Sequence, residues 1–177
     1  MQGFRIYSPQ RFAEVFAPVF AHLADLTWLA LPSSFRYPFE WLDDCADDDP
    51  VVVARIATFE SLVRPVEERS WNGVHEFGYV VDAAFFPDQA GWVSSDWASL
   101  FGLRQPVTDA RAWLQNYYAH ARRDEYLAAH CSVVLQSVDS AFYKIFAESH
   151  LLDEYRPHLD RSCVRYEATH LANCPAL

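Results

Sequence analysis

Residues 132–147 read SVVLQSVDSAFYKIFA, and the conformation of this stretch decides the fold class of the chain. Val134, Val138 and Phe142 repeat every four residues, which favours a single helix with one apolar face. The alternative is a β-hairpin that turns at residues 139–140, where Asp and Ser are flanked by β-branched and aromatic side chains. The sequence favours the helix, because the apolar stripe continues the helical spacing of the residues before it.

Apolar side chains at helical spacing also occupy most of the remaining chain. These stripes predict helices within residues 12–26, 50–63, 74–85, 96–101, 113–121, 126–138, 151–155 and 159–170. Pro18 predicts a kink in the first helix, while the valines at 51–53 leave a strand as the alternative in the second. The sequence therefore predicts a mainly α-helical, bundle-like fold with one globular domain over residues 1–177. One small β-hairpin at 132–147 is the alternative to a helix there.

The composition of the chain is strongly acidic. The chain has 177 residues, of which 51% are hydrophobic, and this is enough to fill the core of one domain. Its 14 Lys and Arg residues stand against 24 Asp and Glu residues, which gives a formal net charge of −10. Nucleic acids and anionic membranes are bound by Lys and Arg that neutralise phosphate, so the charge disfavours both as partners. A basic protein is the partner that this charge favours.

The N-terminus and the cysteines indicate where the protein acts. Residues 1–5 read MQGFR and lack the apolar core of a signal peptide. Glu14 and Asp25 interrupt the longest apolar stretch, residues 12–31, so no membrane span is predicted. The four cysteines are widely spaced and form no C-x-x-C pair: Cys45, Cys131, Cys163 and Cys174. We therefore expect a cytoplasmic protein with four reduced thiols.

Nucleotide-binding and hydrolase motifs do not occur in the sequence. None of the five glycines belongs to a G-x-G-x-x-G or G-x-x-x-x-G-K-[ST] loop, and there is no G-x-S-x-G elbow. His130 and Cys131 are adjacent, and adjacent residues of a helix diverge by about 100°. A thiolate–base pair is therefore not predicted, and Cys131 is expected to be a buried structural residue. The sequence predicts no catalytic residue and no cofactor.

A metal site formed by helical residues is the alternative to a protein with no catalytic function. Glu167 and His170 are spaced to share one helical face, as ligands do in di-iron bundles. Such a site needs a second Glu-x-x-His pair, which the sequence lacks. Single pairs such as His150 and Glu154 are common surface contacts on helices. We therefore expect no bound metal, and a small helical metal-dependent enzyme that uses a His/Glu site is kept as an alternative.

Five aspartates lie close together within residues 43–49, the segment named here the acidic loop. Their spacing lacks the glycine and the distal glutamate of an EF-hand, and Asp49 is expected to cap a helix that begins at Pro50. The loop is either a solvated connection or an anionic recognition surface with tryptophans beside it as apolar anchors. The partner-binding residues expected on the second interpretation are Trp41, Asp43, Asp44, Asp47, Asp48, Trp92 and Trp97.

The C-terminal part of the chain resembles segments of small bacterial immunity proteins. The similar residues are SVDSAFYKIFA at 137–147, the leucines at 151–152 and the pair at 158–159. Immunity proteins neutralise a cognate secreted toxin. The resemblance implies a hairpin followed by a helix, in a cytoplasmic, non-enzymatic inhibitor that masks a site on the toxin.

The leading hypothesis is therefore an acidic binding protein that inhibits a basic protein, namely an immunity protein that neutralises a basic toxin. One alternative is the metal-dependent enzyme, with Glu167 and His170 as its first candidate residues. The other is an acidic mimic of nucleic acid that blocks a DNA-binding protein, which surface carboxylates at roughly phosphate spacing would support.

Overall fold

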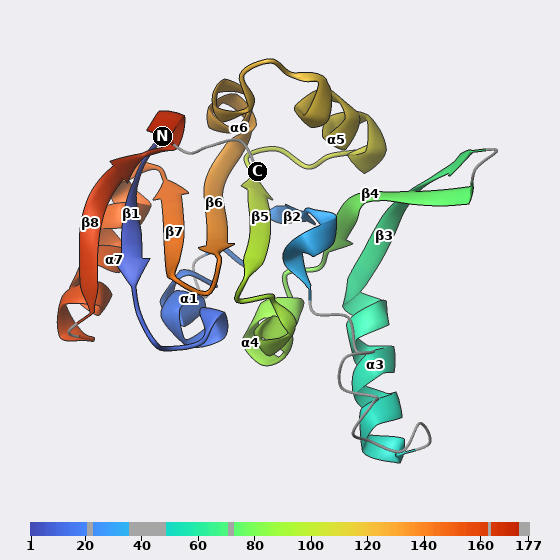
Figure 1. Ribbon diagram of the computed structural model, residues 1–177, viewed down its shortest axis with the longest axis horizontal. Helices are drawn as coiled ribbons and strands as arrows, with labels where there is room; N and C mark the ends of the chain where they lie inside the picture. Colours follow the sequence, from blue (N-terminus) through green and yellow to red (C-terminus); the bar gives the residue numbers. More distant parts are fainter. Residues whose placement is uncertain (21–22, 36–48, 71–72, 163, 174–177) are drawn as a thin grey trace.

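Eight strands form one antiparallel sheet in the computed structural model, which describes residues 1–20, 23–35, 49–70, 73–162 and 164–173 (Figure 1). Across the sheet the strands follow the order β3-β4-β2-β5-β6-β7-β1-β8. Their bounds are β1 (Gln2–Tyr7), β2 (Thr27–Ala30), β3 (Val63–Ser70), β4 (Gly73–Val81), β5 (Trp97–Leu103), β6 (Cys131–Val138), β7 (Phe142–Ala147) and β8 (Arg165–His170). The prediction of a mainly α-helical bundle is therefore wrong.

The stretch at 132–147 forms the β6–β7 hairpin in the interior of this sheet. Asp139 and Ser140 have φ angles of 50° and 51°, and the Ala141 N–H donates to the Val138 carbonyl over 2.9 Å. Two successive positive φ angles are typical of type I′ turns, whose twist matches that of the flanking strands. β6 also pairs with β5, and β7 pairs with β1. The helix that the sequence favours here is wrong, and the hairpin alternative is confirmed.

Helices cover both faces of the sheet. Their bounds are α1 (Phe12–Phe20), α3 (Pro50–Leu62), α4 (Phe85–Gln89), α5 (Ala110–Ala119), α6 (Arg123–His130) and α7 (Ser149–Arg161), with 3-10 turns η1 (Pro32–Ser34), η2 (Ala90–Trp92) and η3 (Leu171–Asn173). α1, α4 and α7 pack on one face, and α5 and α6 pack on the other. Along β6, Val133 and Leu135 belong to the first core while Val134 belongs to the second. The inner strands are thus buried on both faces.

This double burial explains why apolar spacing predicts helices where strands form. A strand buried on both faces is a nearly continuous apolar run, and periodicity alone does not distinguish such a run from a buried helix. β4 and β5 occupy most of the segments at 74–85 and 96–101, and β8 occupies half of the segment at 159–170. The helical stripe of 126–138 is divided between α6, which ends at His130, and β6, which begins at Cys131. β8 lies at an edge of the sheet, and its pairing with β1 is an interaction that side-chain spacing does not report.

Helices with strong local signals are confirmed. α1 contains Pro18, whereas α7 continues through Pro157, so the helix predicted at 151–155 is longer than expected. Asp49 caps α3 as expected, because its carboxylate accepts the Val51 N–H over 2.8 Å. The strand alternative at 51–53 is therefore wrong.

α3 and the β3–β4 hairpin extend away from the body of the sheet (Figure 1). Gly78 lies where this hairpin joins β2: its φ is 154°, and a Cβ atom there would lie 2.3 Å from the Ala30 carbonyl oxygen. The pairing of β3 with β4 shifts register between Val66 and Glu67, opposite this glycine. Such a shift is typical of a β-bulge, which bends a strand pair.

Gly78→Ala is expected to destabilise the protein by more than about 2 kcal/mol, because the added methyl group overlaps the backbone of β2. Gly91→Ala is the matched control, since a Cβ atom there meets nothing within 4 Å. The control is expected to stay within about 0.5 kcal/mol of wild type. Urea unfolding followed by tryptophan fluorescence measures both free energies of unfolding. Equal stability of the two variants would contradict the close approach of β4 to β2.

Candidate functional site

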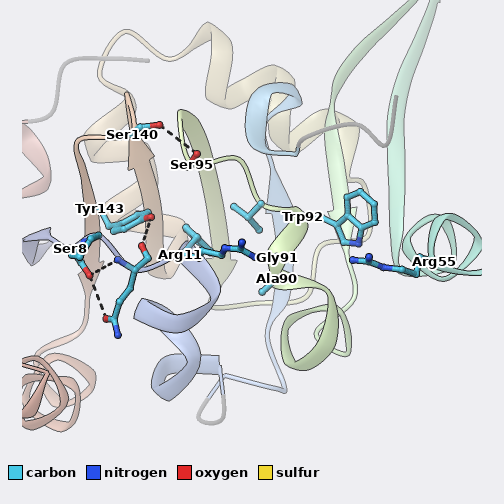
Figure 2. Close-up of a pocket in the computed structure, with 13 residues that line it drawn as sticks. Ser8, Arg11, Arg55, Ala90, Gly91, Trp92, Ser95, Ser140 and Tyr143 are labelled. Atoms are coloured by element: carbon cyan, nitrogen blue, oxygen red, sulfur yellow. Dashed lines mark hydrogen bonds between the residues drawn. The ribbon is translucent and has the colours of Figure 1, made fainter. Parts of the chain in front are cut away.

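A pocket of about 410 Å³ opens at the end of the sheet where β1 leads into α1 (Figure 2). Its volume falls within the range of small-molecule sites. Four separate stretches of the chain line it: the β1–α1 loop with Phe12, Arg55 of α3, residues 90–95 around η2, and the β6–β7 hairpin through Ser140 and Tyr143. The sheet topology brings the strands that carry these stretches together, since β5, β6, β7 and β1 lie next to one another in this order in the sheet.

The β1–α1 loop, residues 8–11, is held in a defined conformation. Ser8 Oγ accepts the Gln10 N–H over 3.1 Å, which closes a short turn. The hydroxyl of Tyr143, a buried residue of β7, donates to the Gln10 carbonyl over 2.8 Å. From this fixed loop the Arg11 side chain extends into the pocket (Figure 2).

The β6–β7 turn forms a second wall. Ser140 keeps a left-handed backbone in which glycine would be less strained. Its hydroxyl donates to the Asp96 carboxylate and lies 3.5 Å from Ser95 Oγ. The N–H of Ser140 also donates to the Ser95 carbonyl over 3.1 Å, and the N–H of Asp139 donates to the Asp96 carbonyl. These bonds fasten the turn to the segment before β5, so this wall is rigid.

Trp92 and Arg55 form the third wall. Trp92 is 8% exposed, and its Nε1–H donates to Gln89 Oε1 over 2.9 Å. The guanidinium carbon of Arg55 lies 5.0 Å from the centroid of the Trp92 ring, which is a cation–π contact. One turn further along α3, the Phe59 ring packs on the same indole, with 6.0 Å between the two ring centroids. α3 is therefore docked through Phe59 in a position that directs Arg55 towards the pocket.

The wall of the pocket is basic although the protein is acidic. Its described lining contains Arg11 and Arg55 but neither Asp nor Glu. Among the residues that the structure describes, neither guanidinium forms a hydrogen bond or an ion pair. Figure 2 shows the two side chains extending into the pocket from opposite sides. Two cations that face one space repel each other, and together they attract an anion.

A second surface lies on the other side of α3. Val51 is 65% exposed and Val53 is 49% exposed, whereas Phe59 is the buried residue of this helix. Arg55 and Glu60 are its charged residues. The α3 outer face is defined by the exposed apolar and small residues Val53, Ala54, Ala57, Thr58 and Ser61, whereas Val51 lies one turn before Arg55 on the pocket side of the helix. Exposed apolar side chains that gather on one element are typical of protein-binding surfaces.

The expected partner-binding residues are only partly covered by the structure. Five of them lie outside the described residues, so their role stays a prediction: Trp41, Asp43, Asp44, Asp47 and Asp48. Trp92 is buried and lines the pocket, while Trp97 is 42% exposed and begins β5 opposite Val138. Trp97 does not belong to the described pocket lining, so the two tryptophans occupy different environments.

The His/Glu pair considered for metal binding lies on a strand. Glu167 and His170 belong to β8, where a separation of three residues places side chains on opposite faces. The Tyr7 hydroxyl donates to the Glu167 carboxylate, and the Ala172 N–H donates to His170 Nδ1 over 3.1 Å. The described residues contain no group of three or more His, Cys, Asp or Glu side chains placed to hold a metal ion. The shared helical face expected for this pair is therefore wrong.

Cys131 is a buried structural residue, as expected. It begins β6 with no exposed surface, and burial raises the pKa of its thiol far above the usual range, although Arg104 acts in the opposite direction. Partial burial lowers the pKa of the neighbouring His130, and Arg104 adds to this effect. Both shifts oppose a thiolate–imidazolium pair. The other three cysteines lie outside the described residues.

No protein-family model, curated protein or solved structure matches this chain. Within the described residues, no helix has the length and apolar character needed to cross a bilayer. Function is therefore inferred from the chain's own geometry.

Sequence reasoning missed the two arginines of the pocket. Arg11 immediately precedes α1, and Arg55 lies in α3, whose start at Asp49-Pro50 is visible in the sequence. Nothing local indicates that these helices meet, because the sheet between them forms through long-range pairing. The signal that the sequence offered for this site was that both residues are positively charged in an acidic chain.

Cys131 in the folded protein is expected to resist iodoacetamide at pH 8, because its thiol is inaccessible and its pKa is raised. The same cysteine is expected to react fully in 6 M guanidinium, on the order of the unfolding concentrations of stable domains. Peptide mass spectrometry after alkylation measures both states. Rapid modification of Cys131 in the folded protein would show that β6 does not begin inside the core.

Proposed function

We propose that this chain is a cytoplasmic binding protein that inhibits a basic protein, and that it acts as an immunity protein which neutralises a toxin. In this proposal the α3 outer face supplies the apolar contact and the acidic character of the chain attracts the partner. No metal, cofactor, nucleic acid or membrane takes part.

The observation that carries the proposal is the exposure of apolar side chains on α3. Val51 and Val53 each present a branched aliphatic group to solvent, Val53 on the α3 outer face and Val51 on the other side of a helix that is tied to the core through Phe59. Full burial of one such side chain is worth about 1.5–3 kcal/mol, so exposing two of them on one helix leaves substantial binding energy unused. A partner with a complementary apolar patch would recover that energy.

The charge of the chain favours a basic partner. The net charge of −10 favours encounter with a basic protein, since complementary charge mainly accelerates association. The acidic loop immediately precedes α3 in sequence, and its last member, Asp49, caps the helix. Acidic residues beside an apolar contact form the polar rim that surrounds the anchors of many interfaces.

The arrangement at the C-terminal end agrees with the resemblance to immunity proteins. That resemblance implies a hairpin followed by a helix, and β6, β7 and α7 follow one another in this way. The α3 outer face also favours direct docking over mimicry of nucleic acid, because mimicry requires rows of carboxylates and this face is apolar.

The test uses Val53→Arg/Ala57→Arg, two substitutions one turn apart on the α3 outer face, against a basic toxin encoded beside the gene of this chain. Both substitutions remove apolar contact and add positive charge, so the dissociation constant is expected to rise about 30-fold, equivalent to about 2 kcal/mol. Co-expression of toxin and wild type is expected to restore cell growth, while the variant restores it less. Biolayer interferometry measures the dissociation constant.

Gln115→Arg/Asn116→Arg is the matched control, because these positions are exposed on α5 and undergo the same change of charge. It is expected to bind and protect almost as wild type does. Equal losses in the two double variants would reduce the effect to net charge. Loss of binding in Trp97→Ala with none in the α3 variant would move the interface to β5, and failure of wild type to protect cells would reject the proposed function.

A further inference from the structure

We propose that the pocket between the β1–α1 loop, α3 and the β6–β7 turn binds a small organic phosphate, with Arg11 and Arg55 holding the phosphate group. This ligand site is separate from the proposed inhibition of a basic protein. Val53 and Arg55 are two residues apart on a helix, so they point to nearly opposite sides of α3.

The charge distribution in the pocket favours an anionic ligand. The chain has 24 acidic side chains against 14 basic ones, so a basic pocket wall departs from its overall charge. Arg11 and Arg55 nevertheless face the same pocket, and within the described part of the chain neither is neutralised by an ion pair. An anion bound between them relieves their mutual repulsion and gains two charge-assisted contacts.

The chemistry of arginine selects the anion. Each guanidinium presents a planar fork of N–H donors that suits bidentate contact with phosphate or carboxylate. One carboxylate has two oxygens and is satisfied by one fork, whereas a phosphate monoester offers three terminal oxygens and a charge near −2. Two forks converging from opposite sides therefore match the phosphate better. The Ser8 and Ser95 hydroxyls on the wall are further hydrogen-bonding groups for its oxygens.

The size and the apolar part of the wall indicate that the ligand extends beyond the phosphate. The pocket holds about 410 Å³, which is the size of sites that take organic molecules. Phe12, Trp92 and Val93 line it beside the arginines. An organic group attached to the phosphate finds apolar contact there, while inorganic phosphate leaves this wall unused.

The walls are fixed before any ligand binds. Tyr143 holds the loop that carries Arg11, and the Trp92 ring supports the Arg55 guanidinium at 5.0 Å. Ser140 and Asp96 fasten the turn that closes the third side. Because the loop and the turn are already in place, the ordering that binding requires is mainly that of the two arginine side chains.

The experiment titrates phenyl phosphate, inorganic phosphate and the neutral compound phenol into the full chain by isothermal calorimetry. Phenyl phosphate is expected to bind with 1:1 stoichiometry and at least about tenfold more tightly than inorganic phosphate, and phenol is not expected to bind. Arg11→Gln and Arg55→Gln are each expected to weaken phenyl phosphate at least about tenfold, the equivalent of one charge-assisted contact. Arg55→Lys, which keeps the charge without the fork, is expected to fall between wild type and Arg55→Gln.

Arg64→Gln is the matched control, because Arg64 is an exposed residue of β3 that does not line the pocket. It is expected to bind as wild type does, and circular dichroism checks that every variant is folded. No binding of phenyl phosphate to folded wild type at 10 mM, roughly the weakest affinity of interest, would overturn the proposal. Equal affinity in the Arg64 control and the pocket variants would also overturn it. Inorganic phosphate binding as tightly as phenyl phosphate would reject the organic class of ligand. The binding of a basic partner through Val53 is expected to be unaffected by any of these results.

Discussion

β6 and β7 carry large apolar side chains on both of their faces, so this hairpin is stable only where both faces are covered. Val133 and Leu135 need one layer of helices and Val134 and Phe146 need another, and these layers are supplied by α1, α4 and α7 on one face and by α5 and α6 on the other. Removal of apolar surface from water is the dominant favourable contribution to folding. The remaining strands extend the sheet outward from this hairpin.

Both candidate surfaces lie where that double layer ends. The pocket forms at the strand ends, where the β6–β7 turn meets the β1–α1 loop and η2. α3 lies further out and is joined to the core by one buried side chain, Phe59, so its opposite side is left exposed. The same helix therefore has Arg55 on the pocket side and Val53 on the outer face. A rigid sheet that carries variable peripheral segments is a common arrangement for binding functions.

The sequence predicted a structural feature correctly where the residues that produce it are close together in the chain. Asp49-Pro50 is a local cap, and it located the start of α3 correctly. β4 and β5 were assigned to helices, because a strand buried on two sides has the apolar density of a buried helix. The excess of acidic residues suggested a basic partner, but it gave no indication of the basic pocket. The two arginines of this pocket are brought together by tertiary structure alone.

A doubly buried hairpin thus supports a peripheral helix whose outer face is exposed. Native-state hydrogen–deuterium exchange of the isolated protein, resolved by residue, measures this difference between the hairpin and the helix. The paired amides of β6 and β7 are expected to exchange only through global unfolding and to be the slowest in the chain. The amides of α3 are expected to exchange much faster, through local opening, because one buried side chain anchors the helix. Fast exchange in β6 and β7, or protection of α3 equal to theirs, would show that the hairpin is not the stable centre of the fold.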